Sequence, residues 1–317
     1  MDKRYPQTLL ATACVPWTET YEFDEPLFRQ NVSLLLENGI NNIYIFGTAG
    51  EGYAVSRDQY LRITKAFLDE MNRHDGAQPM VGVISLSMPE TVERINLGIE
   101  LGAKDFQISF PSWGAVAQDE GMNFLRTICR EFPRARFMHY NNSLRSKTRL
   151  GAKSYGRLAE ELPNLVAVKN PGLGLAELQE FHGAGLPLQF FNLEYAYGFA
   201  SLIEQNGFLV SIAGLNFDKA RAYFEAGKIR DIDAIVSLHR DFQCLFDSLR
   251  ENAPSGLMDG AYDKIFVKAH IEGFPLRLYP PYEGLADESC LSFLNAAKRA
   301  LPHWFHCPGG NGAEENA

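Results

Sequence analysis

Lys169 is the residue whose place in the sequence most directly suggests chemistry. It follows the apolar residues 165–168, so its side chain leaves a segment that reads as a buried strand. Burial disfavours the ammonium form of a lysine and lowers its pKa, which leaves free amine near neutral pH. A free amine attacks a ketone, and the iminium that forms accepts an electron pair from a neighbouring carbon. The alternative is a lysine whose amine has already reached solvent at the strand end.

Tyr140 ends another apolar run, and a phenol can carry the protons that such chemistry requires. Imine formation needs proton transfers to and from the carbinolamine and the substrate hydroxyl. A phenol held between the amine and the substrate can perform them, whereas a tyrosine of the core would only reach the rim with its hydroxyl. Tyr140 is therefore a candidate proton carrier for Lys169.

Two further features could each hold a carboxylate. The glycine-flanked turn 47–50 offers backbone N–H groups, and Thr48 adds a hydroxyl donor. The turn carries no P-loop lysine, which favours a carboxylate over a phosphate, although glycine-rich turns also occur for steric reasons alone. Arg145, five residues after Tyr140, is a candidate clamp for a second carboxylate, and the alternative is an arginine solvated in a loop.

Eight short apolar runs, most of them followed by a helical pattern, must position these residues. The predicted strands are 8–13, 42–46, 80–84, 106–110, 136–139, 165–169, 188–191 and 208–212. Runs that are apolar throughout are typical of parallel strands buried on both faces. Eight such units in one chain predict a closed (β/α)₈ TIM barrel, an α/β fold in which groups at the carboxyl ends of strands converge. An open doubly wound sheet is disfavoured because residues 12–17 contain no glycine-rich nucleotide fingerprint.

The helices carry recognisable start signals. Ser56 and Gln59 form a capping-box pattern before the helix that follows the second strand, and Ser87 opens the next helix. Glu51 is also expected to cap a helix and is given no role in chemistry. Strand signals stop near residue 228, and 231–249, 257–271 and 288–301 read as helices. The prediction is a catalytic barrel over 1–228, a three-helix appendage over 229–306 and a disordered tail over 307–317.

Composition excludes several classes of partner. The net charge of −9 and the lack of a basic block argue against nucleic acid or an anionic membrane surface. No run approaches the roughly 20 apolar residues of a membrane span, and no signal-peptide pattern opens the sequence. Five widely spaced cysteines without paired ligand spacing read as reduced thiols of a cytoplasmic protein. No strand end offers a cluster of metal ligands, so neither a metal nor another cofactor is expected.

Taken together, three strand ends resemble the dihydrodipicolinate synthase/N-acetylneuraminate lyase family of class I, pyruvate-dependent lyases. Residues 47–51 resemble the G-[TS]-x-G-E turn of this family, and Tyr140-Asn141 resembles its Y-N motif. Lys169, 29 residues after Tyr140, matches the Schiff-base lysine. Residues 208–212 stand where the family has a G-x-I-S-V strand, and the low-level similarity runs from Thr8 to Leu301.

The resemblance implies a metal-independent barrel with three C-terminal helices, which usually assembles as a homotetramer. Lys169 would form the imine with a small 2-oxo acid, and Tyr140 would transfer protons. Thr48 would bind the carboxylate and join the proton relay. The remaining contacts to the 2-oxo acid would come from Gly47, the Ala49 N–H and the Val210 carbonyl.

Departures from the family pattern bear on the second substrate. Ala49 stands where the synthase branch has a second threonine, and no tyrosine lies between Tyr60 and Tyr140 to complete the relay of that branch. Trp113 instead suggests an aromatic wall, as in hydratase-aldolases that act on arylidene pyruvates. Arg145 does match the second-carboxylate arginine of the synthases, but the loop 141–144 lacks their proline and 192–194 lacks their glycine-acid-acid turn.

The sequence therefore predicts a Schiff-base lyase or aldolase that acts on pyruvate or a related 2-oxo acid and makes or breaks a C–C bond. The alternatives are a dehydratase or hydratase-aldolase of the same family, or an authentic 4-hydroxy-tetrahydrodipicolinate synthase. A non-catalytic 2-oxo acid or sugar acid binding protein is disfavoured, because a binder needs neither Lys169 nor Tyr140. A metal-dependent barrel aldolase is disfavoured because its ligands are missing from the strand ends.

Overall fold

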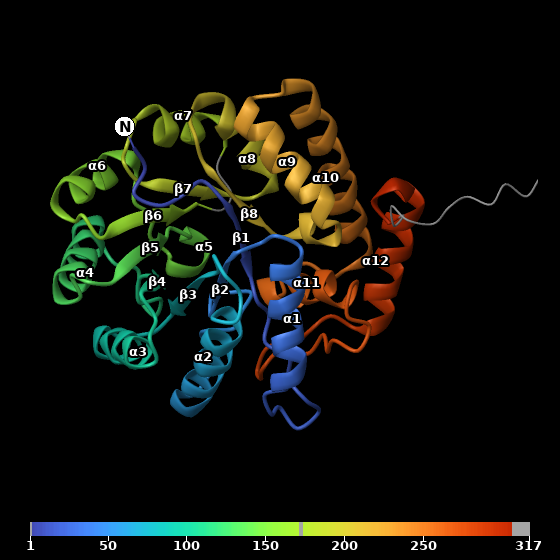
Figure 1. The fold of residues 1–317 in the computed structure, drawn as a ribbon, viewed down its shortest axis with the longest axis horizontal. Coiled ribbons are helices and arrows are strands. Elements are labelled where there is room, and N and C mark those ends of the chain that lie inside the picture. The colour runs from blue at the N-terminus through green and yellow to red at the C-terminus, as the bar shows by residue number, and fades with distance from the viewer. Residues whose placement is uncertain (1, 171–173, 306–317) are drawn as a thin grey trace, which may run out of the picture.

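The computed structural model, which describes residues 2–170 and 174–305, is a closed barrel of eight parallel strands, as predicted (Figure 1). The predicted tail 307–317 lies outside the described residues. Each strand pairs with its neighbours in sequence, and β1 closes the barrel against β8. The strands are β1 (Leu9–Thr12), β2 (Asn42–Ile45), β3 (Gln78–Val83), β4 (Asp105–Ile108), β5 (Arg136–Tyr140), β6 (Leu165–Lys169), β7 (Gln189–Asn192) and β8 (Gly207–Val210).

The strands are buried on both faces, which explains their unbroken apolar character. Side chains that point outward pack under the ring of helices in one large core. Side chains that point inward form a smaller cluster in the lumen, which includes Leu10, Tyr44, Met138 and Leu209. This cluster fills the lower barrel and leaves the carboxyl ends of the strands as the place for a site.

The helices surround the barrel, and two of them begin at the predicted caps. Ser56 and Gln59 form the capping box of α2, and the Ser87 side chain caps α3. Their bounds are α1 (Glu25–Glu37), α2 (Arg57–Met71), α3 (Met88–Glu100), α4 (Gln118–Glu131), α5 (Ser143–Ser146), α6 (Ala152–Glu161), α7 (Leu175–Gly183), α8 (Glu194–Ile203), the 3-10 helix η1 (Ile212–Leu215) and α9 (Phe217–Ile229).

Three helices follow the barrel, as predicted, and the first and the last of them lie along one side of it (Figure 1). They are α10 (Ile232–Asn252), α11 (Asp259–Lys268) and α12 (Asp287–Ala300), and a 3-10 turn, η2 (Pro302–Trp304), ends the described chain. α10 packs on α8 and α9, while α11 contacts η1 directly after β8. α11 therefore lies at the carboxyl ends of the strands. Within the described chain, no helix has both the length and the apolar character to cross a bilayer.

Glu51 is not a helix cap, contrary to the prediction, because Ser56 caps α2. Its carboxylate is fully buried and forms an ion pair with Lys264 of α11 at 2.6 Å. It also accepts hydrogen bonds from the Trp17 indole at 3.1 Å and from the Tyr279 backbone N–H at 2.7 Å. The turn after β2, the segment after β1 and the C-terminal appendage are thus joined through one carboxylate.

Removing one partner of this ion pair should strongly destabilise the protein. Glu51→Gln or Lys264→Met leaves a charge buried without its partner, which costs about 3–5 kcal/mol in the free energy of unfolding. The double variant removes both charges and should recover part of that loss. Urea unfolding followed by circular dichroism measures each value.

The exposed pair Arg57–Glu93 provides the matched control. Its side chains are 57% and 50% exposed, so Glu93→Gln should cost only about 0–1 kcal/mol. Equal losses in the free energy of unfolding for Glu51→Gln and Glu93→Gln would contradict the expectation that the buried pair stabilises the fold more than the exposed pair.

Candidate active site

The carboxyl ends of the strands and helix α11 enclose a cavity of about 520 Å³. Lys169, Tyr140, Ala49 and Val210, four of the residues singled out from the sequence, line it. A second cavity of about 240 Å³ adjoins the first, and Thr48 and Arg145 line that one. Tyr140 contributes to both cavities and stands at the wall between them.

Lys169 is the last residue of β6 and is only 4% exposed. Its register partners are Tyr140 on β5 and Phe191 on β7, which hold the lysine stem between two strands. Burial lowers the pKa of the Lys169 amine to about 8, although the charges of Asp259 and Asp263 oppose the shift. An amine with this pKa is a competent nucleophile near neutral pH.

The hydrogen-bond partner of the Lys169 amine is Tyr44, a residue that sequence reasoning missed. The amine donates to the Tyr44 hydroxyl at 2.7 Å, and burial raises the pKa of that phenol well above its usual value. Tyr44 lies on β2 and points into the lumen. A side chain at Gly47 would come within 2.5 Å of the Tyr44 ring, so the glycine leaves room for the phenol beside the amine. Strand alternation could have placed Tyr44 in the lumen had the inward face of β2 been known.

Tyr140 presents a second phenol to the same amine. The amine lies 4.0 Å from the centre of the Tyr140 ring. The Tyr140 hydroxyl accepts a hydrogen bond from Asn142 at 2.8 Å and a long one, 3.5 Å, from Thr48. Burial raises the pKa of Tyr140 to about 12, and the charge of Asp259 adds to this shift, so the phenol is protonated at neutral pH. Lys169, Tyr140 and Thr48 are thus brought together.

Arg145 is close to this group but already has a partner. Its guanidinium, on α5, donates to the Asp259 carboxylate at 2.5 Å. The pair links α5 to the first residue of α11. A second substrate carboxylate would have to displace Asp259 in order to reach Arg145, which lines the smaller cavity together with Thr48.

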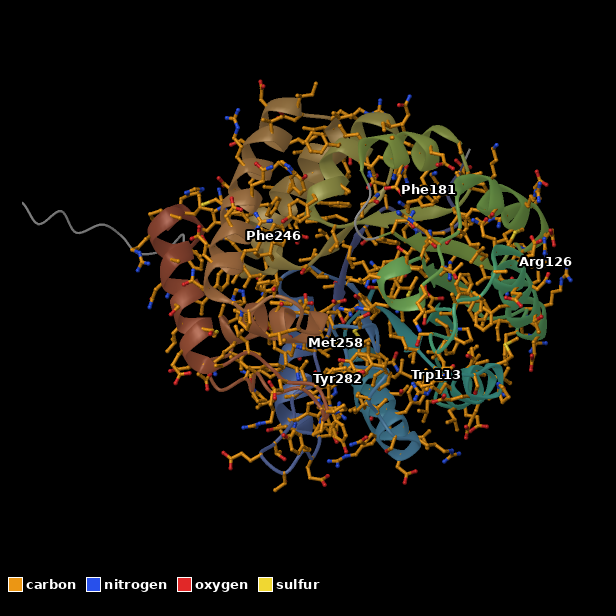
Figure 2. All side chains as sticks on the ribbon, turned by 180° about the vertical axis from the view of Figure 1, so that it is seen from behind. Trp113, Arg126, Phe181, Phe246, Met258 and Tyr282 are labelled. Atoms are coloured by element: carbon orange, nitrogen blue, oxygen red, sulfur yellow. The ribbon has the colours of Figure 1, made fainter. Side chains whose placement is uncertain are left out.

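The prediction that Trp113 forms an aromatic wall of the cavity is wrong for this chain. The Trp113 side chain is 84% exposed and lies at the surface, apart from Phe246 on α10 (Figure 2). Trp113 lies in the loop after β4, where the strand pattern no longer predicts which way a side chain points. Tyr195 and Phe246 supply aromatic lining of the large cavity instead, with their rings stacked 4.3 Å apart.

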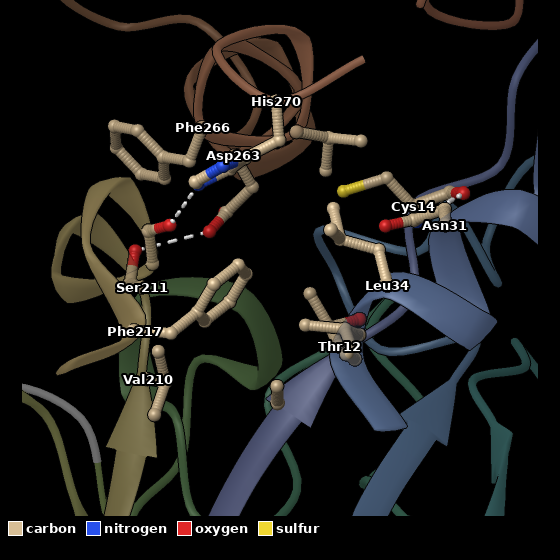
Figure 3. A pocket seen from close by; sticks show the side chains of 14 residues that line it. Thr12, Cys14, Asn31, Leu34, Val210, Ser211, Phe217, Asp263, Phe266 and His270 are labelled. Carbon is tan, nitrogen blue, oxygen red and sulfur yellow. Dashed lines mark hydrogen bonds between the residues drawn. The ribbon is translucent and has the colours of Figure 1, made fainter. Parts of the chain in front are cut away.

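Helix α11 adds a second carboxyl, Asp263, that the sequence did not suggest. Asp263 lines the large cavity, and the Ser211 hydroxyl donates a hydrogen bond to it at 3.0 Å. Figure 3 shows this bond from a neighbouring pocket, which the two residues also line. Burial raises the pKa of Asp263 to about 7, and the charge of Asp259 adds to the shift. Asp259 and Asp263 are four residues apart, and both line this cavity. Among residues 2–170 and 174–305, no group of three or more His, Cys, Asp or Glu side chains could hold a metal ion.

Comparison with known proteins is consistent with this arrangement. The sequence model of the dihydrodipicolinate synthetase family matches residues 6–181. The chain is 25% identical to 4-hydroxy-tetrahydrodipicolinate synthase of Salinibacter ruber over 166 residues, which cover 52% of this chain and 54% of the relative. It is 28% identical to trans-O-hydroxybenzylidenepyruvate hydratase-aldolase of Sphingobium xenophagum over 178 residues, 55% and 52% of the two chains. It is 28% identical to rat (Rattus norvegicus) N-acetylneuraminate lyase over 142 residues, 44% of each chain. The chain thus spans about half the length of the curated relatives it matches.

Solved structures share the fold over nearly their whole length. Dihydrodipicolinate synthase from Aquifex aeolicus superposes with a TM-score of 0.80 at 15% identity, over 94% of this chain and 98% of that one. CdNal from Clostridium difficile, solved in complex with mannosamine, superposes with a TM-score of 0.79 at 17% identity, over 92% and 98%. At these identities the likeness shows the fold alone.

The reactivity of Lys169 should rise with pH through its lowered pKa. Only the free amine is acylated, so the rate of modification by acetic anhydride should reach half its maximum near pH 8. A lysine in a model peptide, with a pKa of about 10.4, serves as the reference. Mass spectrometry of the peptide that contains Lys169 gives the rate at each pH. A half-maximum at the reference value would contradict the desolvation of this amine.

Proposed function

The chain belongs to the dihydrodipicolinate synthetase family, and on this basis we propose that it is a Schiff-base lyase that acts on pyruvate or a related 2-oxo acid. It makes or breaks a C–C bond next to the imine. The observation that carries the proposal is the buried Lys169 amine, which lies 4.0 Å from the Tyr140 ring and 2.7 Å from the Tyr44 hydroxyl. A binding protein would require neither a free amine nor two phenols beside it.

The reaction begins when the Lys169 amine attacks C2 of the 2-oxo acid and gives a carbinolamine. The carbinolamine loses its hydroxyl as water after a proton is delivered to that oxygen, and the iminium remains. Tyr140 is the proton carrier, because the amine lies 4.0 Å from the centre of its ring and its protonated hydroxyl is hydrogen-bonded to Thr48 and Asn142. Loss of a proton from C3 then gives an enamine, whose C3 adds to an aldehyde, and the reverse sequence cleaves the bond.

Tyr44 serves the amine itself. Its hydroxyl accepts a hydrogen bond from the Lys169 amine and so holds the nitrogen in place at the end of β6. The carboxylate of the 2-oxo acid is bound by the Thr48 hydroxyl and the Ala49 N–H of the turn that begins at Gly47. Val210, the last residue of β8, lines the same cavity, and its carbonyl is the further contact that the family resemblance assigns. The Thr48 hydroxyl and the Ala49 N–H act at short range, which allows an anion to bind to a chain with a net charge of −9.

A second candidate function is hydratase-aldolase action on an arylidene pyruvate, as the name of the Sphingobium xenophagum relative describes. The stacked rings of Tyr195 and Phe246 favour it, because they form an apolar face for an aryl group within the large cavity. Authentic 4-hydroxy-tetrahydrodipicolinate synthesis has less support. Arg145 is engaged by Asp259, and Ala49 lacks the hydroxyl of the second threonine.

A cytoplasmic location and a homo-oligomer, either dimer or tetramer, complete the proposal. The location is supported by the free thiols of Cys14, Cys129, Cys244 and Cys290. The assembly is supported by exposed apolar side chains near the smaller cavity, among them Leu144, which is 76% exposed.

Borohydride reduction in the presence of pyruvate tests the chemistry directly. The iminium is reduced to a stable secondary amine, so peptide mapping should find a pyruvyl adduct on Lys169. Lys169→Ala should give none, whereas Lys147→Ala, at an exposed lysine, should trap pyruvate like the wild type. An adduct on another lysine, or turnover that survives Lys169→Ala, would overturn the proposal.

Substitution of the two phenols should separate their roles. Tyr140→Phe should lower turnover roughly 10²–10⁴-fold, because general acid–base catalysis typically contributes that much, and should change half-saturation by pyruvate little. Tyr44→Phe removes a hydrogen-bond acceptor from the ammonium form, so the pH of half-maximal trapping should fall below that of the wild type. An unchanged turnover in Tyr140→Phe would remove this residue from the mechanism. Steady-state kinetics and the pH profile of trapping provide the two measurements.

A further inference from the structure

One wall of the large cavity carries a polar pair that imine formation at Lys169 does not use. Asp263, on α11, and Ser211, directly after β8, line the cavity together with Lys169. The Ser211 hydroxyl donates to the Asp263 carboxyl at 3.0 Å (Figure 3). The pair therefore faces whatever a substrate carries beyond its imine carbon.

The Ser211 segment is held in place by a second buried carboxylate. Glu194, at the start of α8, accepts hydrogen bonds from the backbone N–H of Ser211 at 2.7 Å and of Ala213 at 3.0 Å. The Ser211 hydroxyl in turn binds Asp263, so both members of the pair have a fixed position. A fixed acceptor discriminates between ligands better than a mobile one, because no ordering entropy is lost on binding.

Three cations near the cavity, apart from Lys169, are already paired with other carboxylates. Arg145 binds Asp259 and Arg149 binds Glu177, both at 2.5 Å, while Lys264 binds Glu51 at 2.6 Å.

Asp263 instead accepts a hydrogen bond from a neutral hydroxyl, that of Ser211. Burial and the charge of Asp259 raise the pKa of Asp263 to about 7, while the Lys169 ammonium lowers it and Glu194 raises it further. The α11 side of the cavity thus presents two carboxyl groups, Asp259 and Asp263, as hydrogen-bond acceptors.

We propose that Asp263, positioned by Ser211, is a specificity-determining residue that accepts a hydrogen bond from a hydroxyl or amino group of the electrophile. The inference rests on the proposed function, since the electrophile is the compound that joins the 2-oxo acid held by Lys169. A substrate without such a donor leaves a buried acceptor unpaired, and a site of this kind rejects the deoxy analogue strongly. A substrate with a second carboxylate meets like charge at the same place.

Three 2-oxo acids that differ at C4 and beyond test the inference without requiring turnover. All can form the imine at Lys169, and borohydride trapping records each one by the mass of its intact adduct. The probes are 4-hydroxy-2-oxopentanoate, its deoxy analogue 2-oxopentanoate, and the dianion 2-oxoglutarate. The wild type should reach half-maximal trapping with the hydroxy acid at a concentration at least about tenfold lower than with 2-oxopentanoate, and 2-oxoglutarate should trap most weakly.

Two substitutions separate the hydrogen bond from the charge. Asp263→Ala should abolish the preference for the hydroxy acid, so that in this variant the hydroxy acid and 2-oxopentanoate reach half-maximal trapping at concentrations within about twofold of each other. Asp263→Asn retains an acceptor oxygen but no charge, so it should keep part of the preference and trap 2-oxoglutarate better than the wild type. Asp287→Asn, on α12 at a side chain 71% exposed, is the matched control and should change none of these values.

Pyruvate distinguishes the two ways in which this test can fail. Pyruvate has no C4, so every Asp263 variant that folds should still trap it at Lys169, with only the pH dependence shifted by loss of the Asp263 charge. If the wild type traps no pyruvate, the proposed function fails. If pyruvate is trapped but the wild type binds the hydroxy and deoxy acids equally, or Asp263→Ala keeps the preference, the role assigned to Asp263 is overturned. Even if no variant folds, the ratio of the half-maximal concentrations of the hydroxy and deoxy acids in the wild type tests the role of Asp263.

Discussion

The dry interior of the closed barrel is the constraint on which the rest of the site depends. Eight parallel strands surround a lumen filled by their own inward side chains, and Lys169 ends one strand just above that filling. At the pKa of a solvated lysine, fewer than roughly one amine in a thousand would be free at pH 7. With a pKa of about 8, roughly one in ten is free. The fold makes this amine nucleophilic because burial lowers its pKa, and the Tyr44 hydroxyl accepts a hydrogen bond from it.

Burial of charged side chains also makes helix α11 important for the structure. Asp259, Asp263 and Lys264 lie within six positions of one helix and meet different partners. Asp259 engages Arg145, Asp263 faces the cavity beside Ser211, and Lys264 is buried against Glu51. A buried charge without a partner would be costly, so each pairing also fixes the helix over the strand ends. The appendage thus closes the site and contributes to its lining.

The sequence revealed the features that depend on local pattern and missed those that depend on tertiary placement. The eight strands were predictable because strands buried on both faces read as apolar runs, and Lys169 and Tyr140 were found because they end such runs. Tyr44 escaped because alternation gives two faces without saying which one is the lumen. Asp263 escaped because nothing local indicates that a helix after residue 228 returns to the strand ends. The same limit explains the wrong expectations for Glu51, whose partner is 213 positions away, and for Trp113, which lies beyond its strand.

The two sides of the cavity have opposite polarity, and this gives a substrate its direction. The turn that contains Thr48 and Ala49 offers donors, whereas α11 presents the acceptor Asp263 and keeps Arg145 neutralised through Asp259. Under the proposed function, the carboxylate of a 2-oxo acid would gain contacts at the turn and meet like charge at α11, and this would orient its C2 toward Lys169. Because repulsion from the wrong wall acts together with attraction to the right one, selectivity does not require an additional cation in the site. The net negative charge of the chain is compatible with an anionic substrate for the same reason, since the donors that bind the anion are local and the acidic groups lie where its uncharged end belongs.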